Sequence, residues 1–410
     1  MAVAPGYKQT EVGVIPEDWP VIPLGDCARF RTVPFGSALH KSDYTEDGVP
    51  VVNPMHIGPD GLEPTRTMTV TEQAANALAD FRLRPGDIVL GRRGDMGRCA
   101  LVQAEHAGWL CGTGSMIVRC GATTDAAFMR RVLSSPRAIA ALEEGSVGTT
   151  MVNLNQGSLS RLLVQFPPRL EQRAIAEALG DVDALLAGLD RLIAKKRDLK
   201  QAAMQRLLTG QTRLLGFHER WDVKRIADVA TPRSEKNVRG ESLPVLTCSK
   251  HLGFVDSLRF FKNQVFSDDL SSYKLIRRGE IGYPANHVEE GSIGLQHLYD
   301  AALVSPIYIV FAVSGDVSSP FLHRVLKLDS YRQEFKTATS ASVDRRGSLR
   351  WPAFSEIEVR IPSLPEQAAI AEVLSDMEAE LAALEARREK TRALKQAMMQ
   401  ELLTGRIRLV

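Results

Sequence analysis

Cysteine is scarce in this 410-residue sequence, and its spacing excludes two kinds of site. The five cysteines contain no C-x-x-C pair and form no even-numbered framework: they are Cys27, Cys99, Cys111, Cys120 and Cys248. A redox dithiol site and a disulfide-stapled fold are therefore excluded. We expect free thiols in a reducing, cytoplasmic environment.

Long apolar runs and a strong charge of one sign are also missing. No apolar run approaches the roughly 18 residues that a membrane-spanning helix needs, so no membrane association is expected. The first residues, MAVAPGYKQTEVGVIPEDW, lack the basic start and apolar stretch of a secretion signal. The net charge of +2 argues against a uniformly basic polyanion-binding surface but leaves local basic patches open.

Motifs for catalysis and metal binding are absent as well. There is no G-x-x-x-x-G-K-[ST] for nucleotide phosphates, and the eight histidines show no H-E-x-x-H or other tight metal spacing. The segment WLCGTGSM at 109–116 leads into a strand-like stretch rather than a helix, which a cofactor loop would require. NPM at 53–55 lacks the second proline and the aromatic residue of an adenine-methyltransferase motif. The sequence therefore predicts no catalytic residues and no metal ligands.

The chain does contain a long internal repeat. Residues 199–210 read LKQAAMQRLLTG and residues 394–405 read LKQAMMQELLTG. At an offset of 195, roughly 27 of the 48 positions from 167–214 match those of 362–409, more than shared helix-forming composition explains. Both copies begin with proline followed by EQ, and both end with LLTG and a nearby R-L.

Each copy predicts one helix of about 38 residues, roughly 57 Å long. Its apolar residues recur in alternating steps of four and three, the heptad pattern of a helix that packs against another. The predicted seam consists of Ile175, Leu179, Val182, Leu186 and Leu189 in the first copy and Ile370, Leu374, Met377, Leu381 and Leu384 in the second. The second stripe falters at Arg388 and Thr391 and is expected to resume at Leu394. We expect the two stripes to cover each other; a solvated face on a bundle is the alternative.

The segments before the helices repeat more faintly. RPGDIVL at 84–90 corresponds to RRGEIGY at 277–283, and short β-type stretches surround both. Short helices are expected at 126–143 and 320–336. The predicted fold class is α+β: two tandem α/β units, each followed by a long helix, with the two helices paired as an antiparallel coiled coil.

In combination and order, these segments resemble the specificity (S) subunit of type I restriction-modification systems. The opening of the family's first target-recognition domain is resembled by TEVGVIPEDW at 10–19. The glycine-rich hairpin of that domain is resembled by RPGDIVLGRRGDMGRCALV at 84–102. SYKLIRRGEIGYPAN resembles the core of a second domain. The two EQ…LLTG helices are similar to the family's spacer regions. The resemblance implies target-recognition domains at 1–166 and 215–361 and spacer helices at 167–214 and 362–410.

The resemblance also implies a function. The chain would be a non-catalytic subunit that reads an asymmetric bipartite site in double-stranded DNA. Its helices would dock two modification (methyltransferase) subunits, and restriction (motor-nuclease) subunits would join through the complex. No cofactor is expected on this chain; S-adenosylmethionine, ATP and Mg are expected on the partner subunits. A twofold reader with two different domains would read two different half-sites.

Side-chain chemistry suggests which residues contact DNA. Arg92, Arg93 and Arg98 lie in a glycine-punctuated hairpin, where arginine can reach guanine edges or phosphates; a solvated basic turn is the alternative. Asn286 and His287 follow YPA on a loop, where asparagine can pair with adenine or simply form a turn. Further polar loop candidates are Asn153, Asn155, Ser249, Lys250, Arg345 and Arg346. The basic run at 195–197 is interpreted as a solvated or partner-facing helix surface.

Two other functional classes remain open from the sequence. One is a coiled-coil assembly protein without a nucleic-acid role, which the low net charge favours. The other is a methyltransferase or nuclease whose active site carries no recognisable motif. DNA binding at several salt concentrations separates the first from a DNA reader. An activity assay with DNA, magnesium and S-adenosylmethionine tests the second.

Overall fold

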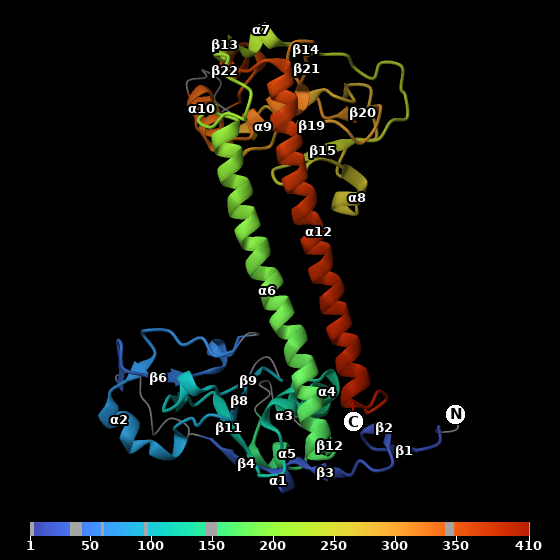
Figure 1. The fold of residues 1–410 in the computed structure, drawn as a ribbon. Helices are drawn as coiled ribbons and strands as arrows, with labels where there is room; N and C mark the ends of the chain where they lie inside the picture. The colour runs from blue at the N-terminus through green and yellow to red at the C-terminus, as the bar shows by residue number, and fades with distance from the viewer. Residues whose placement is uncertain are drawn as a thin grey trace. The chain divides into compact units, whose positions relative to one another are not determined.

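The chain folds into two compact units (Figure 1). The computed structural model describes residues 4–32, 43–58, 61–93, 97–144, 154–340 and 348–409. Unit 1 comprises Met1–Arg191 and Glu385–Val410, and unit 2 comprises Leu192–Leu384. Each unit mixes helices with sheets and includes a part of both long helices, so the predicted α+β class is confirmed.

Unit 1 is built around a four-stranded antiparallel sheet of order β4-β11-β8-β9. The strand β11 pairs with β8 from Ser115↔Gly91 to Arg119↔Asp87, and the short β9 closes a hairpin on β8. Its strands are β1 (Tyr7–Thr10), β2 (Gly13–Pro16), β3 (Val21–Pro23), β4 (Ala28–Arg31), β5 (Tyr44–Thr45), β6 (Val49–Val52), β7 (Thr69–Val70), β8 (Asp87–Gly91), β9 (Cys99–Leu101), β10 (Leu110–Cys111), β11 (Ser115–Cys120) and β12 (Leu163–Gln165). Its helices before the long one are α1 (Leu24–Cys27), η2 (Pro54–His56), α2 (Glu72–Ala77), η3 (Ala79–Phe81), η4 (Ala104–His106), α3 (Ala126–Leu133), α4 (Pro136–Glu144) and α5 (Gln156–Ser160).

Unit 2 repeats the central sheet, with strand order β14-β21-β18-β19. The two-stranded pair β13-β22 likewise corresponds to β3-β12 of unit 1. Its strands are β13 (Asp222–Arg225), β14 (Ala230–Arg233), β15 (Leu246–Ser249), β16 (Gly253–Asp256), β17 (Lys274–Arg277), β18 (Ile281–Pro284), β19 (Gly294–Leu295), β20 (Ala301–Val304), β21 (Tyr308–Val313) and β22 (Glu358–Ile361). Its shorter helices are α7 (Ile226–Val229), α8 (Ser257–Phe261), η5 (Val288–Glu290), α9 (Ser319–Leu326), α10 (Asp329–Ser340) and α11 (Trp351–Ser355).

Each expected short helix is in fact two helices. The segment 126–143 is divided between α3 and α4, and 320–336 between α9 and α10. In unit 1 the break has a chemical cause, because Pro136 cannot donate the backbone hydrogen bond of a continuing helix but suits the first position of a new one.

The two long helices are α6 (Arg169–Leu207) and α12 (Leu364–Leu403), close to the predicted lengths. Both end at the LLTG sequence, where Gly210 and Gly405 adopt the left-handed conformation with φ of +72° and +69°. A glycine in this conformation satisfies the last carbonyls of a helix and stops it. The repeated glycine is therefore a helix terminator.

Ion pairs show that the two helices run antiparallel within each unit. In unit 1, Lys395 pairs with Asp183 at 2.6 Å, and Arg388 with Asp190 at 3.3 Å. In unit 2, Lys196 pairs with Glu380 at 2.6 Å, and Lys200 with Glu378 at 3.1 Å. In both units the residue number falls on α12 as it rises on α6, which defines an antiparallel pair.

The predicted seam residues lie on the covered faces of the two helices. Ile175, Leu179, Leu189, Ile370, Leu374 and Leu381 are buried, and Val182, Leu186, Met377 and Leu384 are partly buried. The seam ends enter the globular cores. Ile175 and Leu179 share the unit 1 core with Leu402 and Leu403, and Ile370 and Leu374 share the unit 2 core with Leu207 and Leu208.

One detail of the expected stripe is wrong. Leu394 was expected to resume the seam, yet 56% of it is exposed. Thr391 is buried instead, with its hydroxyl donating to the Arg387 carbonyl at 2.9 Å. A threonine that bonds to its own helix satisfies its polar atom, so it can occupy a position expected to be apolar.

Candidate nucleic-acid interface

The hairpin β8–β9 of unit 1 begins at a turn fixed by an acidic side chain. Gly86 is left-handed with φ of +88°, and the Asp87 carboxylate accepts from the Arg84 backbone N–H at 2.9 Å. The same carboxylate accepts two bonds of 2.7 Å from the Arg119 guanidinium, which raises the pKa of Arg119. This buried fork fixes β8 to β11 and so fixes the hairpin.

Unit 2 builds the corresponding turn in the same way. Gly279 is left-handed with φ of +88°, and the Glu280 carboxylate accepts from the Arg277 backbone N–H at 2.8 Å. The faint match between RPGD and RRGE thus marks the start of equivalent hairpins. The segments after β8 and β18 therefore occupy equivalent places in the two units.

The predicted arginines of unit 1 lie on the β8–β9 hairpin. Arg92 is partly buried, and Arg93 and Arg98 are exposed. Arg92 donates from Nε to the Leu154 carbonyl at 3.0 Å, while the Leu154 N–H donates to the Arg92 carbonyl at 3.0 Å. Burial, followed by the charge of Arg93, lowers the pKa of Arg92. Part of Arg92 therefore holds a neighbouring segment in place.

That neighbouring segment carries another predicted candidate, Asn155. Its side chain accepts from the Ser158 N–H at 2.8 Å and caps α5, a structural role. The structure thus brings Asn155 beside the arginine hairpin although 62 residues separate it from Arg93 in sequence. Asn153 lies outside the described residues.

The same junction exists in unit 2. The Leu349 N–H donates to the Ala285 carbonyl at 2.7 Å, just as Leu154 donates to Arg92. Asn286 and His287 follow Ala285 and are exposed, and His287 Nδ1 lies 3.1 Å from Glu290 Oε1. The predicted Arg345 and Arg346 lie outside the described residues.

Ser249 and Lys250 lie in the turn between β15 and β16. The Ser249 hydroxyl accepts from the backbone N–H groups of His251 and Leu252, both at 3.4 Å, which makes it a turn former. The Lys250 carbonyl accepts from Lys327 Nζ at 2.8 Å, and the same ammonium donates to the Gly291 carbonyl at 3.3 Å. This ammonium connects the β15–β16 turn to the β18–β19 segment that carries Asn286.

The described candidates therefore form two clusters, one in each unit. We call them reading cluster 1 (Arg92, Arg93, Arg98 and Asn155) and reading cluster 2 (Ser249, Lys250, Asn286 and His287). Cluster 1 offers guanidinium and amide groups, whereas cluster 2 offers an ammonium, an amide and an imidazole. Both can present hydrogen-bond donors and acceptors to base edges or phosphates.

The GTG segment that suggested a cofactor loop has a packing role. Gly114 precedes β11, and a Cβ added there would lie 2.9 Å from Pro54 Cδ. A Cβ on Gly112 would overlap the Asn53 side-chain oxygen. Both glycines therefore permit the close approach of the turn that carries NPM.

The cysteine thiols are unsuited to nucleophilic chemistry. Burial raises the pKa of Cys99 to about 11 and the pKa of Cys111 to about 12. Such thiols stay protonated near neutral pH. Among the described residues, His, Cys, Asp and Glu side chains form no group of three that could hold a metal ion. In the same part of the chain, no helix is both long and apolar enough to cross a bilayer.

The EQ motif has a role that the sequence did not reveal. In unit 2, Glu366 accepts two bonds of 2.6 Å from Arg213 and one of 3.1 Å from Trp221 Nε1. In unit 1, Glu171 accepts from Arg408 at 2.5 and 2.8 Å and from Trp19 Nε1 at 3.1 Å.

In each unit the guanidinium also lies over the indole ring, 5.5 Å from its centroid. We call each set a Trp–Glu–Arg clamp. The sequence repeat contains all three members of the clamp. They are the glutamate of the EQ motif, the arginine of the R-L pair after LLTG, and the tryptophan near the start of each domain.

The glutamine of the motif joins each long helix to its globular part. Gln172 accepts from the Asp125 N–H at 2.8 Å and donates to the Pro167 carbonyl at 2.8 Å. Gln367 does the same with the Ser318 N–H at 2.7 Å and the Pro362 carbonyl at 2.8 Å. Glutamate and glutamine together therefore fix the start of each long helix.

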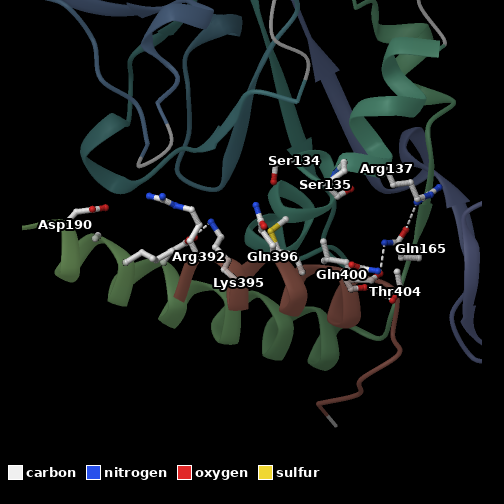
Figure 2. A pocket seen from close by; sticks show the side chains of 16 residues that line it. Ser134, Ser135, Arg137, Gln165, Asp190, Arg392, Lys395, Gln396, Gln400 and Thr404 are labelled. Atoms are coloured by element: carbon white, nitrogen blue, oxygen red, sulfur yellow. Dashed lines mark hydrogen bonds and ion pairs between the residues drawn. The ribbon is translucent and has the colours of Figure 1, made fainter. Parts of the chain in front are cut away.

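A cavity of about 840 Å³ lies in unit 1 beside the helix pair (Figure 2). Its wall includes the turn between α3 and α4 and the polar residues Arg392, Gln396 and Gln400 of α12. Gln165 donates to the Leu403 carbonyl at 2.7 Å and accepts from Arg137 at 2.9 Å, which closes one end. The cavity is lined by both polar and apolar side chains.

Comparisons with known proteins agree with these features. A family model described as the type I restriction modification DNA specificity domain matches residues 16–195. A protein from Methanocaldococcus jannaschii, described as a putative type I restriction enzyme MjaX specificity subunit, is 23% identical; the alignment covers 98% of this chain and 96% of the relative.

Two solved structures share the fold. The type I restriction-modification S subunit from M. genitalium has a TM-score of 0.55 at 16% identity, covering 94% of this chain and 96% of that one. The HsdS subunit from Thermoanaerobacter tengcongensis has a TM-score of 0.53 at 17% identity, covering 96% and 98%. The family match falls on unit 1, and unit 2 repeats its sheet, its hairpin turn and its clamp. Residues 16–195 therefore match the type I restriction-modification DNA specificity domain, and the chain as a whole is similar to type I specificity subunits in sequence and in fold.

Proposed function

We propose that this chain is the non-catalytic DNA-recognition subunit of a type I restriction-modification complex. One observation carries the proposal: the segments after β8 and β18 occupy equivalent positions in two related units yet carry different side chains, Arg92, Arg93 and Arg98 in one and Asn286 and His287 in the other. Equivalent positions suit two copies of one recognition task, and different side chains suit two different half-sites. The target is therefore an asymmetric bipartite site in double-stranded DNA.

The proposal extends to segment roles and partners. Residues 1–166 and 215–361 are target-recognition domains, and 167–214 and 362–410 are spacer helices. The helices dock two adenine-methyltransferase subunits, and restriction subunits join through them. The cavity beside Arg392, Gln396 and Gln400 supports docking, because it offers a partner both polar groups and apolar surface. S-adenosylmethionine, ATP and Mg belong to the partner subunits in this proposal.

Exchange of one recognition domain tests the proposal. Residues 1–160 are replaced by the corresponding domain of another specificity subunit, and the chimera is expressed with the modification subunit. Genome-wide methylation mapping should show one half of the motif changed and the other kept. A chimera with the second domain replaced is the matched control and should change the opposite half. Loss of both halves in either chimera that still methylates would contradict two separate readers.

The two alternative classes predict other outcomes. A coiled-coil assembly protein would leave the methylated motif unchanged in both chimeras. A hidden enzyme would make the purified chain methylate or cleave DNA when given only magnesium and S-adenosylmethionine.

A further inference from the structure

Helix α9 contacts the segment that carries half of reading cluster 2. His323 Nε2 lies 3.3 Å from the Ile293 carbonyl, and Lys327 Nζ donates to the Gly291 carbonyl at 3.3 Å. His323 and Lys327 are four residues apart, so they project from one side of the helix. Both carbonyls belong to the connection 285–293 between β18 and β19.

Lys327 also holds the other half of the cluster. Its ammonium donates to the Lys250 carbonyl at 2.8 Å, in the turn between β15 and β16. The side chain is partly buried, and burial lowers the pKa of its amine. A desolvated ammonium is costly unless its donors are used, and two of its three donors here bind backbone carbonyls. The side chain therefore links two loops at the expense of its own solvation.

Within the described part of the chain, the ammonium of Lys327 donates to main-chain carbonyls. Because these bonds go to carbonyls, they fix where the two loops lie and leave the side chains of Lys250 and Asn286 to face other partners. Gly291 is left-handed with φ of +93°, and a Cβ there would lie 3.4 Å from Arg332 Nε. Lys327 and Arg332 therefore both lie against the loop at Gly291.

Unit 1 has no equivalent lysine among its described residues. Ser134 occupies the C-cap position of α3 that Lys327 occupies in α9. Its hydroxyl donates back to the Arg131 carbonyl at 3.2 Å, within its own helix turn. Gly97, the counterpart of Gly291, packs instead against the Ile139 side chain of α4. The two hairpins are therefore supported by different chemistry.

We propose that Lys327 is a positioning residue for recognition of one half-site, holding the loops of Lys250 and Asn286 in a fixed relation without touching DNA. The proposal rests on the proposed DNA-recognition function, and it adds a residue remote from the bases that determines how well one half-site is discriminated. Cluster 1 has no such requirement, so it provides an internal reference in the same chain.

Hydrogen exchange in the DNA-free chain tests the positioning itself. Lys327→Met keeps the length of the side chain and removes both bonds. Amides in 285–293 and 249–253 should exchange about tenfold faster, because the two removed hydrogen bonds no longer hold the loops closed. Amides in 97–102 of unit 1 should be unchanged. Lys250→Met is the matched control: it removes a lysine charge from the same loop but keeps the carbonyl that Lys327 binds, so exchange should stay as in the wild type.

DNA binding by the complex with the modification subunit tests the consequence. Duplexes carry the mapped motif, or the motif with one half-site scrambled. Lys327→Met should reduce discrimination at the unit 2 half-site by about tenfold and leave the unit 1 half-site within twofold. Lys327→Arg, which keeps a long cationic donor, should restore most of the discrimination. The slope of log affinity against log salt should not change, because Lys327 neutralises no phosphate.

Three results would overturn the proposal. They are unchanged exchange at 285–293 in Lys327→Met, an equal loss of discrimination at both half-sites, and a salt slope reduced by about 0.9, which is the signature of a phosphate contact. If the wild-type complex discriminates at neither half-site, the DNA-recognition function fails instead. The exchange experiment still decides whether Lys327 holds the two loops.

Discussion

At the residue scale, Tyr283 is a buried side chain whose hydroxyl has no hydrogen-bond partner among the described residues. Burial raises its pKa well above the usual value, so the hydroxyl stays neutral. Removing an unpaired buried hydroxyl is nearly neutral or stabilising. We expect Tyr283→Phe to leave the free energy of unfolding unchanged or raise it by about 1 kcal/mol, measured by chemical denaturation.

Tyr308→Phe provides the contrast for that measurement. The Tyr308 hydroxyl accepts from the Cys248 N–H at 2.9 Å, so removing the hydroxyl leaves that N–H without its acceptor. For Tyr308→Phe we expect the free energy of unfolding to fall by about 1 kcal/mol. Equal effects of the two substitutions would contradict the assignment of an unpaired hydroxyl to Tyr283.

His323 makes the stability of unit 2 depend on pH. Burial, partly opposed by the Ile293 carbonyl, lowers the pKa of His323 to about 4. The unfolded chain binds the proton near pH 6.5, so stability is full above that pH and falls as pH drops from about 6.5 to 4. The loss is at most about 3 kcal/mol, since the ring is partly exposed. His323→Leu should flatten the difference in denaturation midpoint between pH 7 and 4.5; an unchanged pH dependence would contradict a neutral His323.

Residue chemistry alone led to Arg92, Asn155 and Lys250, but it could not say how each is used. Arg92 binds the Leu154 carbonyl, 62 positions along the chain, and Asn155 caps a helix of only five residues. These partners depend on which loops the sheet brings together. Side-chain type predicts hydrogen-bonding capacity, whereas only the tertiary fold assigns the partner.

At the element scale, the start of each long helix depends on its clamp. Glu366 is buried and accepts three hydrogen bonds from Arg213 and Trp221. Glu366→Gln removes the charge that Arg213 needs, and we expect a loss of about 2 kcal/mol in the stability of unit 2. Chemical denaturation followed by tryptophan fluorescence measures it.

Glu177→Gln is the matched control for the clamp. Glu177 also accepts from an arginine, Arg173, but the pair is exposed and lies on one helix surface. Exposed pairs of this kind contribute little, so denaturation should hardly change. If both substitutions destabilise equally, charge rather than the buried clamp accounts for the effect.

The long helices were the most predictable elements, because a heptad pattern sustained over many turns outweighs local ambiguity. The pattern predicted their ends through proline and glycine. It failed at Leu394, where the stripe was expected to resume, because Thr391, about one helical turn earlier, is buried instead. The short strands β9 and β19 carry too few residues for any periodicity, so the pattern of the sequence did not predict them.

At the scale of the whole molecule, a net charge of +2 must still be reconciled with binding to DNA. The exposed Arg93, Arg98 and Lys250 concentrate positive charge locally. Because each neutralised phosphate contributes a slope of about −0.9, we expect the affinity of the complex to fall steeply with salt, with a log–log slope steeper than about −3. Titrations between about 50 and 200 mM salt measure it, and a flat response would support the assembly-protein alternative.

The repeat predicted two related units, and the folded chain shows how the long helices are divided between them. Each core contains apolar residues from both long helices, so unit 1 combines two separate stretches of sequence, whereas unit 2 is the continuous stretch Leu192–Leu384. Periodicity and self-similarity cannot reveal this, because they describe neighbours along the chain. The clamp of unit 1, which joins Trp19 to Arg408, connects its two stretches through side chains.

The clamp between Glu171 and Arg408 has a consequence for synthesis on the ribosome. The first-made unit needs Leu402, Leu403 and Arg408, which are translated after all of unit 2. At about 5–20 residues per second, the 193 residues of unit 2 (Leu192–Leu384) take roughly 10–40 s. During that interval Ile175 and Leu179 lack their late-made covering residues. The nascent chain thus exposes an apolar helix face for many seconds, and the unit begun first is the one completed last.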